Sequence, residues 1–248
     1  VSTQSTGNIM TKEYFDQNLT VFSPEGKLYQ LEYACEAIAQ AKQGTLALRC
    51  NDGYLYFAQL PTFDRLQNSS QTSYIYKIND FVNCLVAGRS ADGRVLVERI
   101  RSEAAEFYRE FGFQPTADIV AERIADVIQV FTQEAHLRPY GNVVFLAGWD
   151  QENDKSLVYR VDPTGSCVGI KGYAAGFKQN EMNDQLITKK GEFGDVKQAL
   201  RTGLGLFQKY VSASMTGDDI EVWIGKKEGI AKMGAEEVDN LLEELKVE

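Results

Sequence analysis

The feature that most constrains this chain is residues 19–41, where a tight turn leads into an amphipathic helix. Ser23-Pro24-Glu25-Gly26 is typical of a type I turn, because proline fixes φ at the second position and glycine is favoured at the fourth. Beyond the turn, apolar residues recur at helical spacing, which predicts a helix over residues 28–41. This stripe consists of Leu28, Leu31, Cys35 and Ile38.

The opposite side of this predicted helix is not plainly polar. Tyr29, Tyr33 and Ala37 lie there among glutamate and glutamine residues. A helix with apolar residues on two sides usually packs on its own domain and on a further surface. We therefore expect this helix to lie at an interface between subunits.

The order of the predicted elements favours antiparallel sheets with helices in separate layers. Strands follow strands, and helices follow helices, which argues against a doubly wound parallel sheet. The predicted order is a helix (28–41), two hairpins (45–59 and 74–87), a helix pair (90–111 and 115–137), three strands within 143–170, a helix pair (178–190 and 195–211), a strand (221–224) and a final helix with an apolar stripe at 238–245.

At the N-terminal stretch the sequence resembles a known family. Phe15-Asp16 followed by LTVFSPEGKLYQLEYACEAI is similar to the N-terminal signature of proteasome α subunits. The resemblance extends over the whole chain and is nearest to the type-6 kind of α subunit. The stretches that extend it are ERIADVIQVFTQ at 122–133, Arg138-Pro139-Tyr140-Gly141, Asp162-Pro163-Thr164-Gly165 and AAGFKQNE at 174–181.

The resemblance implies a fold and a function. It implies the four-layer α-β-β-α sandwich that proteasome subunits share with N-terminal-nucleophile hydrolases. It also implies a non-catalytic subunit in the seven-membered outer ring of the 20S core particle, stacked on β subunits. Such a subunit gates the entry of unfolded polypeptides and docks regulatory caps, in the cytoplasm and nucleus, for ubiquitin-dependent and other protein degradation.

The resemblance also assigns roles to residues of the signature. Phe15, Asp16, Pro24 and Tyr33 are expected to set the gate and turn geometry. The ring interface is expected at Leu28, Leu31, Cys35 and Ile38. The polar residues 1–13 are expected to be a flexible gate tail, and residues 14–248 a single domain. Gln17 and Lys27 stand where the family usually has arginine, so this chain is expected to contribute less to the gate's hydrogen bonds.

No residue is predicted to be catalytic. The β subunits of the proteasome use an N-terminal threonine whose own amine acts as the base. The matching residue, Thr45, is internal, and Lys77 near the position of their lysine activates nothing alone. Two alternatives stay open: an amidohydrolase of the same fold with a nucleophile exposed by cleavage, and a self-assembling scaffold unrelated to proteolysis.

Composition narrows the partners and cofactors. The formal charge is −9 with no basic block, so nucleic acid is not expected as a partner. No apolar run approaches the ~20 residues of a membrane helix, so no membrane partner is expected. His136 is the single histidine and is expected to be structural or exposed, and no metal or other cofactor is predicted. The four separated cysteines are expected to be buried thiols: Cys35, Cys50, Cys84 and Cys167.

A departure from the family follows the second predicted strand. Many α subunits have a lysine there, in a pocket that receives the C-terminal carboxylate of an activator. Here residues 60 and 61 are Leu60 and Pro61, and the next cation is Arg65. The sequence therefore predicts weak binding of activator tails on this side of the chain.

Overall fold

In a computed structural model of the chain, residues 12–61 and 72–247 are described. The elements are α1 (Lys12–Gln17), α2 (Tyr29–Ala39), β1 (Gly44–Cys50), β2 (Gly53–Gln59), β3 (Ile75–Lys77), β4 (Val82–Gly88), α3 (Ser90–Phe111), α4 (Ala117–Val130), β5 (Asn142–Asp150), β6 (Lys155–Val161), β7 (Cys167–Gly169), β8 (Gly172–Gly176), α5 (Gln179–Thr188), α6 (Val196–Tyr210), β9 (Ile220–Lys226), β10 (Gly229–Lys232) and α7 (Ala235–Val247).

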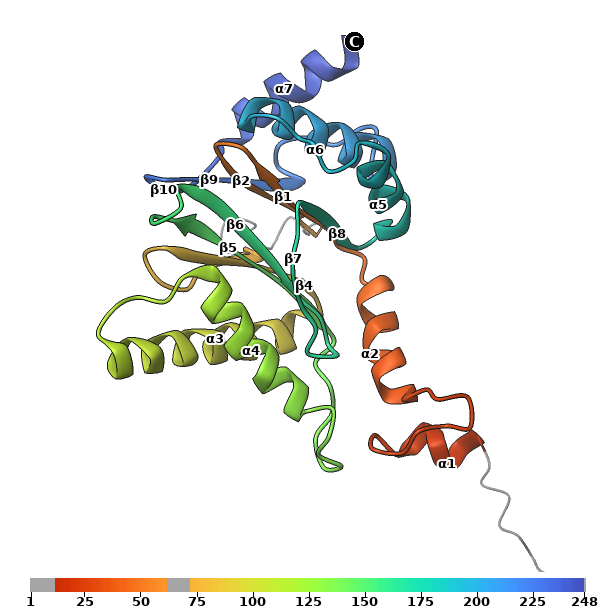
Figure 1. Cartoon of the computed structure of the whole chain (residues 1–248). Coiled ribbons are helices and arrows are strands. Elements are labelled where there is room, and N and C mark those ends of the chain that lie inside the picture. Colours follow the sequence, from red (N-terminus) through yellow and green to blue (C-terminus); the bar gives the residue numbers. More distant parts are fainter. Residues whose placement is uncertain (1–11, 62–71, 248) are drawn as a thin grey trace, which may run out of the picture.

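The strands form two five-stranded sheets that face one another (Figure 1). One has the order β10-β9-β2-β1-β8, and the other has the order β3-β4-β5-β6-β7. Every strand pair within them is antiparallel. The predicted antiparallel sheets are therefore confirmed.

Helices cover the outer face of each sheet, which makes four layers. Helices α5, α6 and α7 lie over the β1-containing sheet, while α3 and α4 lie over the other (Figure 1). A separate apolar cluster fills the space between the sheets. The predicted α-β-β-α sandwich is confirmed.

Strand β2 illustrates why the central strands are apolar on both faces. Successive side chains of a strand point to opposite sides. Leu55 and Phe57 pack against the helices over their sheet, whereas Tyr54 and Tyr56 belong to the cluster between the sheets. Asn83 Nδ2 of the opposite sheet donates to the Tyr54 hydroxyl at 3.0 Å. Burial on both faces therefore replaces the alternation of polar and apolar residues that a surface strand would have.

Helix α2 lies at the edge of the sandwich, and α1 lies beyond it (Figure 1). Only one side of α2 contacts its own chain closely, since Ala34 and Ile38 are its buried residues. Helix α1 begins at Lys12, so the last two residues of the predicted tail are helical. Residues 1–11 of that tail lie outside the described part of the chain.

Several predicted boundaries were wrong, most clearly that of α4. This helix was expected to continue to residue 137, but it ends at Val130. Its last turn tightens, because the Thr132 amide and hydroxyl both donate to the Gln129 carbonyl, at 2.9 and 2.7 Å. The ring of Phe131 then packs on Tyr140, with centroids 4.7 Å apart. The apolar stripe in the sequence therefore continues past the end of the helix.

The expectation of four buried thiols was wrong in part. Cys50 and Cys84 are buried, and burial raises the pKa of each thiol to about 12. Cys35 is exposed on α2, and Cys167 is half-buried. All four are free. Among the described helices, none has an apolar stretch long enough to cross a bilayer.

Candidate functional site

The signature stretch forms a unit of two helices joined by a turn. The amide of Gly26 donates to the Ser23 carbonyl at 2.8 Å, which closes the predicted turn around Pro24. Gly26 has a φ of 77°, a conformation that favours glycine. The Lys27 amide also donates to the Ser23 hydroxyl at 3.1 Å. Phe22 beside the turn is 65% exposed, so the turn presents an aromatic ring to its surroundings.

Asp16 connects α1 to α2. The hydroxyl of Tyr33 donates to the Asp16 carboxylate. The Gln30 side chain donates to the Asp16 backbone carbonyl at 2.5 Å. The hydrogen bond to a carboxylate raises the pKa of Tyr33, because it favours the protonated phenol. Two of the predicted gate residues, Asp16 and Tyr33, are therefore brought together.

The other predicted gate residues have different environments. Phe15 is buried, with its ring edge-on to Tyr14 at a centroid distance of 5.6 Å. Pro24 is exposed at the turn. The buried ring of Phe15 thus anchors α1, and Pro24 shapes the turn. The role of both residues in a gate stays a prediction.

The predicted interface residues of α2 do not share one environment. Ile38 is 3% exposed and belongs to the cluster between the sheets. It has almost no surface left for a neighbouring subunit, because its own chain already covers it. Leu28 and Leu31 are half-buried, and Cys35 is exposed. Leu28, Leu31 and Cys35 thus keep surface for a neighbouring subunit, and the interface at α2 stays a prediction.

Thr45, the position of the possible nucleophile, is enclosed in β1. It has no exposed surface, and its hydroxyl donates to the Ala175 carbonyl at 2.9 Å. The preceding Gly44 amide donates to the Gln59 side chain at 3.1 Å. Lys77 lies on the other sheet, exposed and paired with Asp80 at 2.8 Å. The hydroxyl of Thr45 and the ammonium group of Lys77 therefore each contact another partner, and they do not come together as an N-terminal-nucleophile site.

The described residues offer little support for catalysis by histidine or for a metal site. His136 is 78% exposed at its side chain, 3.4 Å from Glu134, in agreement with the prediction of a surface residue. Among the residues that the structure describes, no group of three histidine, cysteine, aspartate or glutamate side chains is placed to hold a metal ion.

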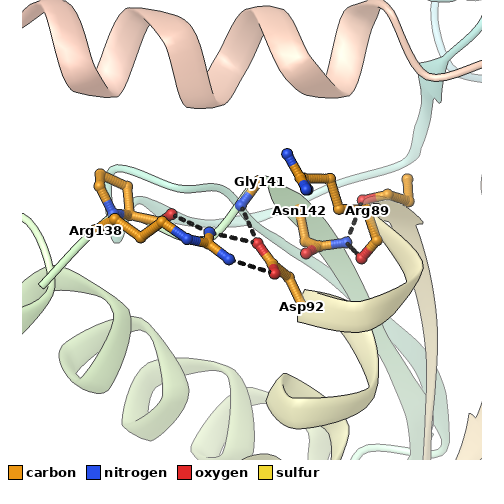
Figure 2. A network of polar contacts seen from close by, with 7 residues as sticks. Arg89, Asp92, Arg138, Gly141 and Asn142 are labelled. Atoms are coloured by element: carbon orange, nitrogen blue, oxygen red, sulfur yellow. Dashed lines mark hydrogen bonds and ion pairs between the residues drawn. The ribbon is translucent and has the colours of Figure 1, made fainter.

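A cluster of polar contacts explains two motifs that the sequence presents far apart (Figure 2). Asp92, in the first turn of α3, is buried and accepts two hydrogen bonds from Arg138, both at 2.6 Å. The Gly141 amide also donates to Asp92, at 3.3 Å. These bonds lower the pKa of Asp92. They fasten the Arg138-Pro139-Tyr140-Gly141 segment to the start of α3.

Asn142 completes this cluster. Its side-chain amide donates to the carbonyls of Ala87 and Arg89, at 3.1 and 3.0 Å (Figure 2). The contacts join the end of β4, the start of α3 and the start of β5. The sequence predicted the helix that begins at residue 90 and identified the Arg138-Pro139-Tyr140-Gly141 stretch, but it did not pair Asp92 with Arg138. The one sequence signal for this pair was an acidic residue in the first turn of a predicted helix and an arginine outside any predicted element.

A cavity of about 900 Å³ lies between the end of α2 and the end of β2. Its lining includes Leu60, the position where many family members have lysine, and also two cations, Lys42 and Arg89. The side chain of Arg89 extends past Gly141 and makes no hydrogen bond to Asp92 in the described part of the chain (Figure 2). Positions 60 and 61 supply no lysine to this cavity, but Lys42 and Arg89 supply cations to it from other parts of the chain. The weak binding of activator tails stays a prediction. Arg65 lies outside the described residues.

Comparison with known proteins agrees with this architecture. Residues 15–37 match the N-terminal signature of A-type proteasome subunits, and residues 41–224 match the proteasome subunit family. The probable alpha type-1 proteasome subunit of Schizosaccharomyces pombe is 33% identical, over 85% of this chain and 87% of its own length.

Two further relatives show the breadth of the match. The alpha type-6 proteasome subunit of Caenorhabditis elegans is 29% identical, over 93% of this chain and 95% of its own length. The alpha proteasome subunit of Methanopyrus kandleri is 29% identical, over 92% of each chain. Since type-1 and type-6 relatives both match, the comparisons support the α class and do not distinguish the type-6 kind. The chain belongs to the proteasome subunit family, as an α-type member of the 20S core.

Proposed function

We propose that this chain is a non-catalytic subunit of the outer, seven-membered ring of the 20S core particle. In this role it contacts neighbouring α subunits and the β ring, and it controls the passage of unfolded polypeptides. The observation that carries the proposal is the N-terminal unit. Helices α1 and α2 extend from the edge of the sandwich, and Asp16 and Tyr33 hold them together.

The environment of Thr45 supports the absence of catalysis. A threonine nucleophile of this fold needs a free α-amine as its base. The nitrogen of Thr45 lies in a peptide bond within β1, and its hydroxyl already donates to Ala175. Cleavage before Thr45 would also detach Gly44, which pairs with Gly176 of β8 and donates to the Gln59 side chain. These features disfavour the alternative of a hydrolase activated by processing.

The position of α2 supports a role in assembly. Leu31 is half-buried, and Tyr33 and Cys35 are exposed on the same helix. Burying a leucine-sized side chain against a neighbour contributes about 1.5–3 kcal/mol. A ring contact through α2 would also hold the turn at Ser23–Gly26 and α1 in place.

The cavity beside α2 supports the docking of regulatory caps. Lys42 and Arg89 line it, and both are cations suited to a peptide's C-terminal carboxylate. The side-chain amide nitrogen of Gln43 is buried at the same place and has no hydrogen-bond partner among the described residues. A location in the cytoplasm and nucleus is part of the proposal and rests on the family resemblance.

One experiment tests the function as a whole. The native complex that contains this chain is purified and its intact mass and subunits are determined by mass spectrometry. The proposal requires seven α and seven β subunits per half-particle, with this chain present once. A homo-oligomer of this chain without β subunits would support a scaffold instead.

A second measurement addresses catalysis directly. The purified chain, with its N-terminus sequenced to exclude cleavage before Thr45, is assayed with fluorogenic peptides. We expect no turnover, and the same result for Thr45→Ala. Turnover that Thr45→Ala abolishes would establish the processed hydrolase and contradict the proposal.

A further inference from the structure

A second cavity lies at the far end of β1 from α2 and has a volume of about 550 Å³. Its walls are the end of β1, the start of β6, the residue before β8 and the loop between α5 and α6. The hydroxyl of Ser156 donates to the Cys50 carbonyl at 3.0 Å, which links the two sheets at this point. The cavity is therefore framed by elements of both sheets.

Three cations line this cavity: Arg49, Lys155 and Lys171. Within the described parts of the chain, none of them forms an ion pair or a side-chain hydrogen bond. Glu192 also lines the cavity, but it forms no ion pair with them. Three cations and one carboxylate thus line the cavity, in a chain whose formal charge is −9, and Asp150 lies opposite Lys155 across the β5–β6 pair.

Two of these cations are direct neighbours across the sheet. The Arg49 amide donates to the Lys171 carbonyl at 2.7 Å, which continues the β1–β8 pairing one residue beyond Leu48 and Gly172. Like charges directly opposite one another on adjacent strands are destabilising. Their placement therefore has a cost that a bound anion would remove.

The loop after α5 is shaped around Lys171. Gly191 has a φ of 64°, and a Cβ atom there would lie 3.0 Å from Lys171 Cδ. A side chain at residue 191 would displace the Lys171 stem from its place along the cavity wall. The loop thus leaves room for the lysine, and the position of its charge depends on this glycine.

We propose that this cavity binds a small polyphosphate anion. Arginine and lysine are the side chains that bind phosphate oxygens, arginine through a planar fork and lysine as a point charge. A volume of about 550 Å³ exceeds the needs of one phosphate group, and three cations suit an anion of several charges. The binding site is separate from α2 and from the cavity that contains Leu60, so it does not depend on the role in cap docking.

Isothermal titration calorimetry of the full chain with inorganic triphosphate, without divalent cations, tests the proposal. We expect binding that weakens as salt is added, because screening reduces the attraction. Arg49→Gln and Lys171→Gln should each weaken binding about tenfold or more, since each removes a charged hydrogen-bond donor. Should one variant fail to fold by circular dichroism, the other and Lys155→Gln still decide the result.

Arg109→Gln is the matched control. It removes the same charge from an exposed arginine in the last turn of α3, away from the cavity, and should change the affinity less than about twofold. Absence of binding at low salt, or equal affinities in all the variants, would overturn the proposal. Tighter binding of a phosphoserine peptide than of triphosphate would also overturn it, in favour of a docking site for a phosphorylated protein.

Discussion

The guanidinium group of Arg138 holds the buried carboxylate of Asp92 through two hydrogen bonds of 2.6 Å each. The two residues lie 46 positions apart in the sequence, one at the start of α3 and one in the segment before β5. Because β5 is the middle strand of its sheet, this pair sets how α3 and the sheet meet.

Arg138→Gln should destabilise the chain, because it leaves the Asp92 carboxylate buried without its partner. We expect the free energy of unfolding in urea to fall by about 1–3 kcal/mol. The value is below that of a fully buried pair, because the side chain of Arg138 is 65% exposed. Lys227→Gln removes a similar but exposed pair with Asp154 and should lower the stability less than Arg138→Gln does. Equal losses in the two variants would contradict the special role of Asp92.

The same pair predicts a dependence on pH. Arg138 holds the pKa of Asp92 below the ordinary value for aspartate. A carboxyl group with a lowered pKa stabilises the folded state above its unfolded pKa and loses this contribution as the pH falls through its folded pKa. The stability difference between the wild type and Arg138→Gln should therefore be constant near neutral pH and shrink below about pH 4. Urea titrations from pH 7 to pH 3 measure it, and a difference that grows on acidification would refute the assignment.

The bond between Asp16 and Tyr33 predicts an effect on the gate. Tyr33→Phe keeps the ring and removes the hydroxyl, while Asp16→Ala removes the acceptor. If this bond orders the N-terminal segment, both variants should raise basal peptide hydrolysis by the assembled particle. Tyr14→Phe, an adjacent change on α1, is the control and should leave the rate unchanged. Unaltered hydrolysis with both variants would show that other subunits close the pore.

A charge on the outer side of α2 should block assembly. Leu31→Asp places a carboxylate at a half-buried position beside the predicted neighbour, where burying an unpaired charge is costly. We expect the variant chain to be excluded from rings, as judged by native gels of the co-expressed subunits. Ile187→Asp on α5 is the control, since Ile187 is 73% exposed. Circular dichroism of the isolated chain separates failed assembly from failed folding, and folded Leu31→Asp in normal rings would contradict the interface.

The cavity beside α2 predicts how an activator tail binds. Arg89→Gln should weaken the binding of a C-terminal activator peptide to the particle, by about tenfold if the two charges meet in a desolvated site. Leu60→Lys adds a cation to the same lining and should strengthen binding. Fluorescence anisotropy of a labelled peptide measures both, with an amidated peptide as the control. Equal affinity for the amidated and free peptides would exclude carboxylate recognition here.

Elements with a strong periodicity of apolar residues could be predicted from the sequence. Strands that depend on pairing with a neighbouring strand could not. The helix stripe of α6 and the apolar run of β5 were both evident in the sequence. Strand β8 was missed, because Gly172–Gly176 is short and four of its five residues are glycine or alanine. It is a strand because β1 pairs with it. The edge strand β10 was missed for a similar reason, since most of its residues are exposed.

By itself, the sequence determined the class of the fold, the turn at Ser23–Gly26 and the family, because these depend on local periodicity, backbone preference and consecutive residues. Only the tertiary structure decided which side chains meet. It buried Ile38 within its own chain, joined Asp16 to Tyr33 and Asp92 to Arg138, and brought Arg89 and Leu60 to the lining of one cavity. These contacts join residues far apart in the chain, and their distances depend on how the sheets and helices pack.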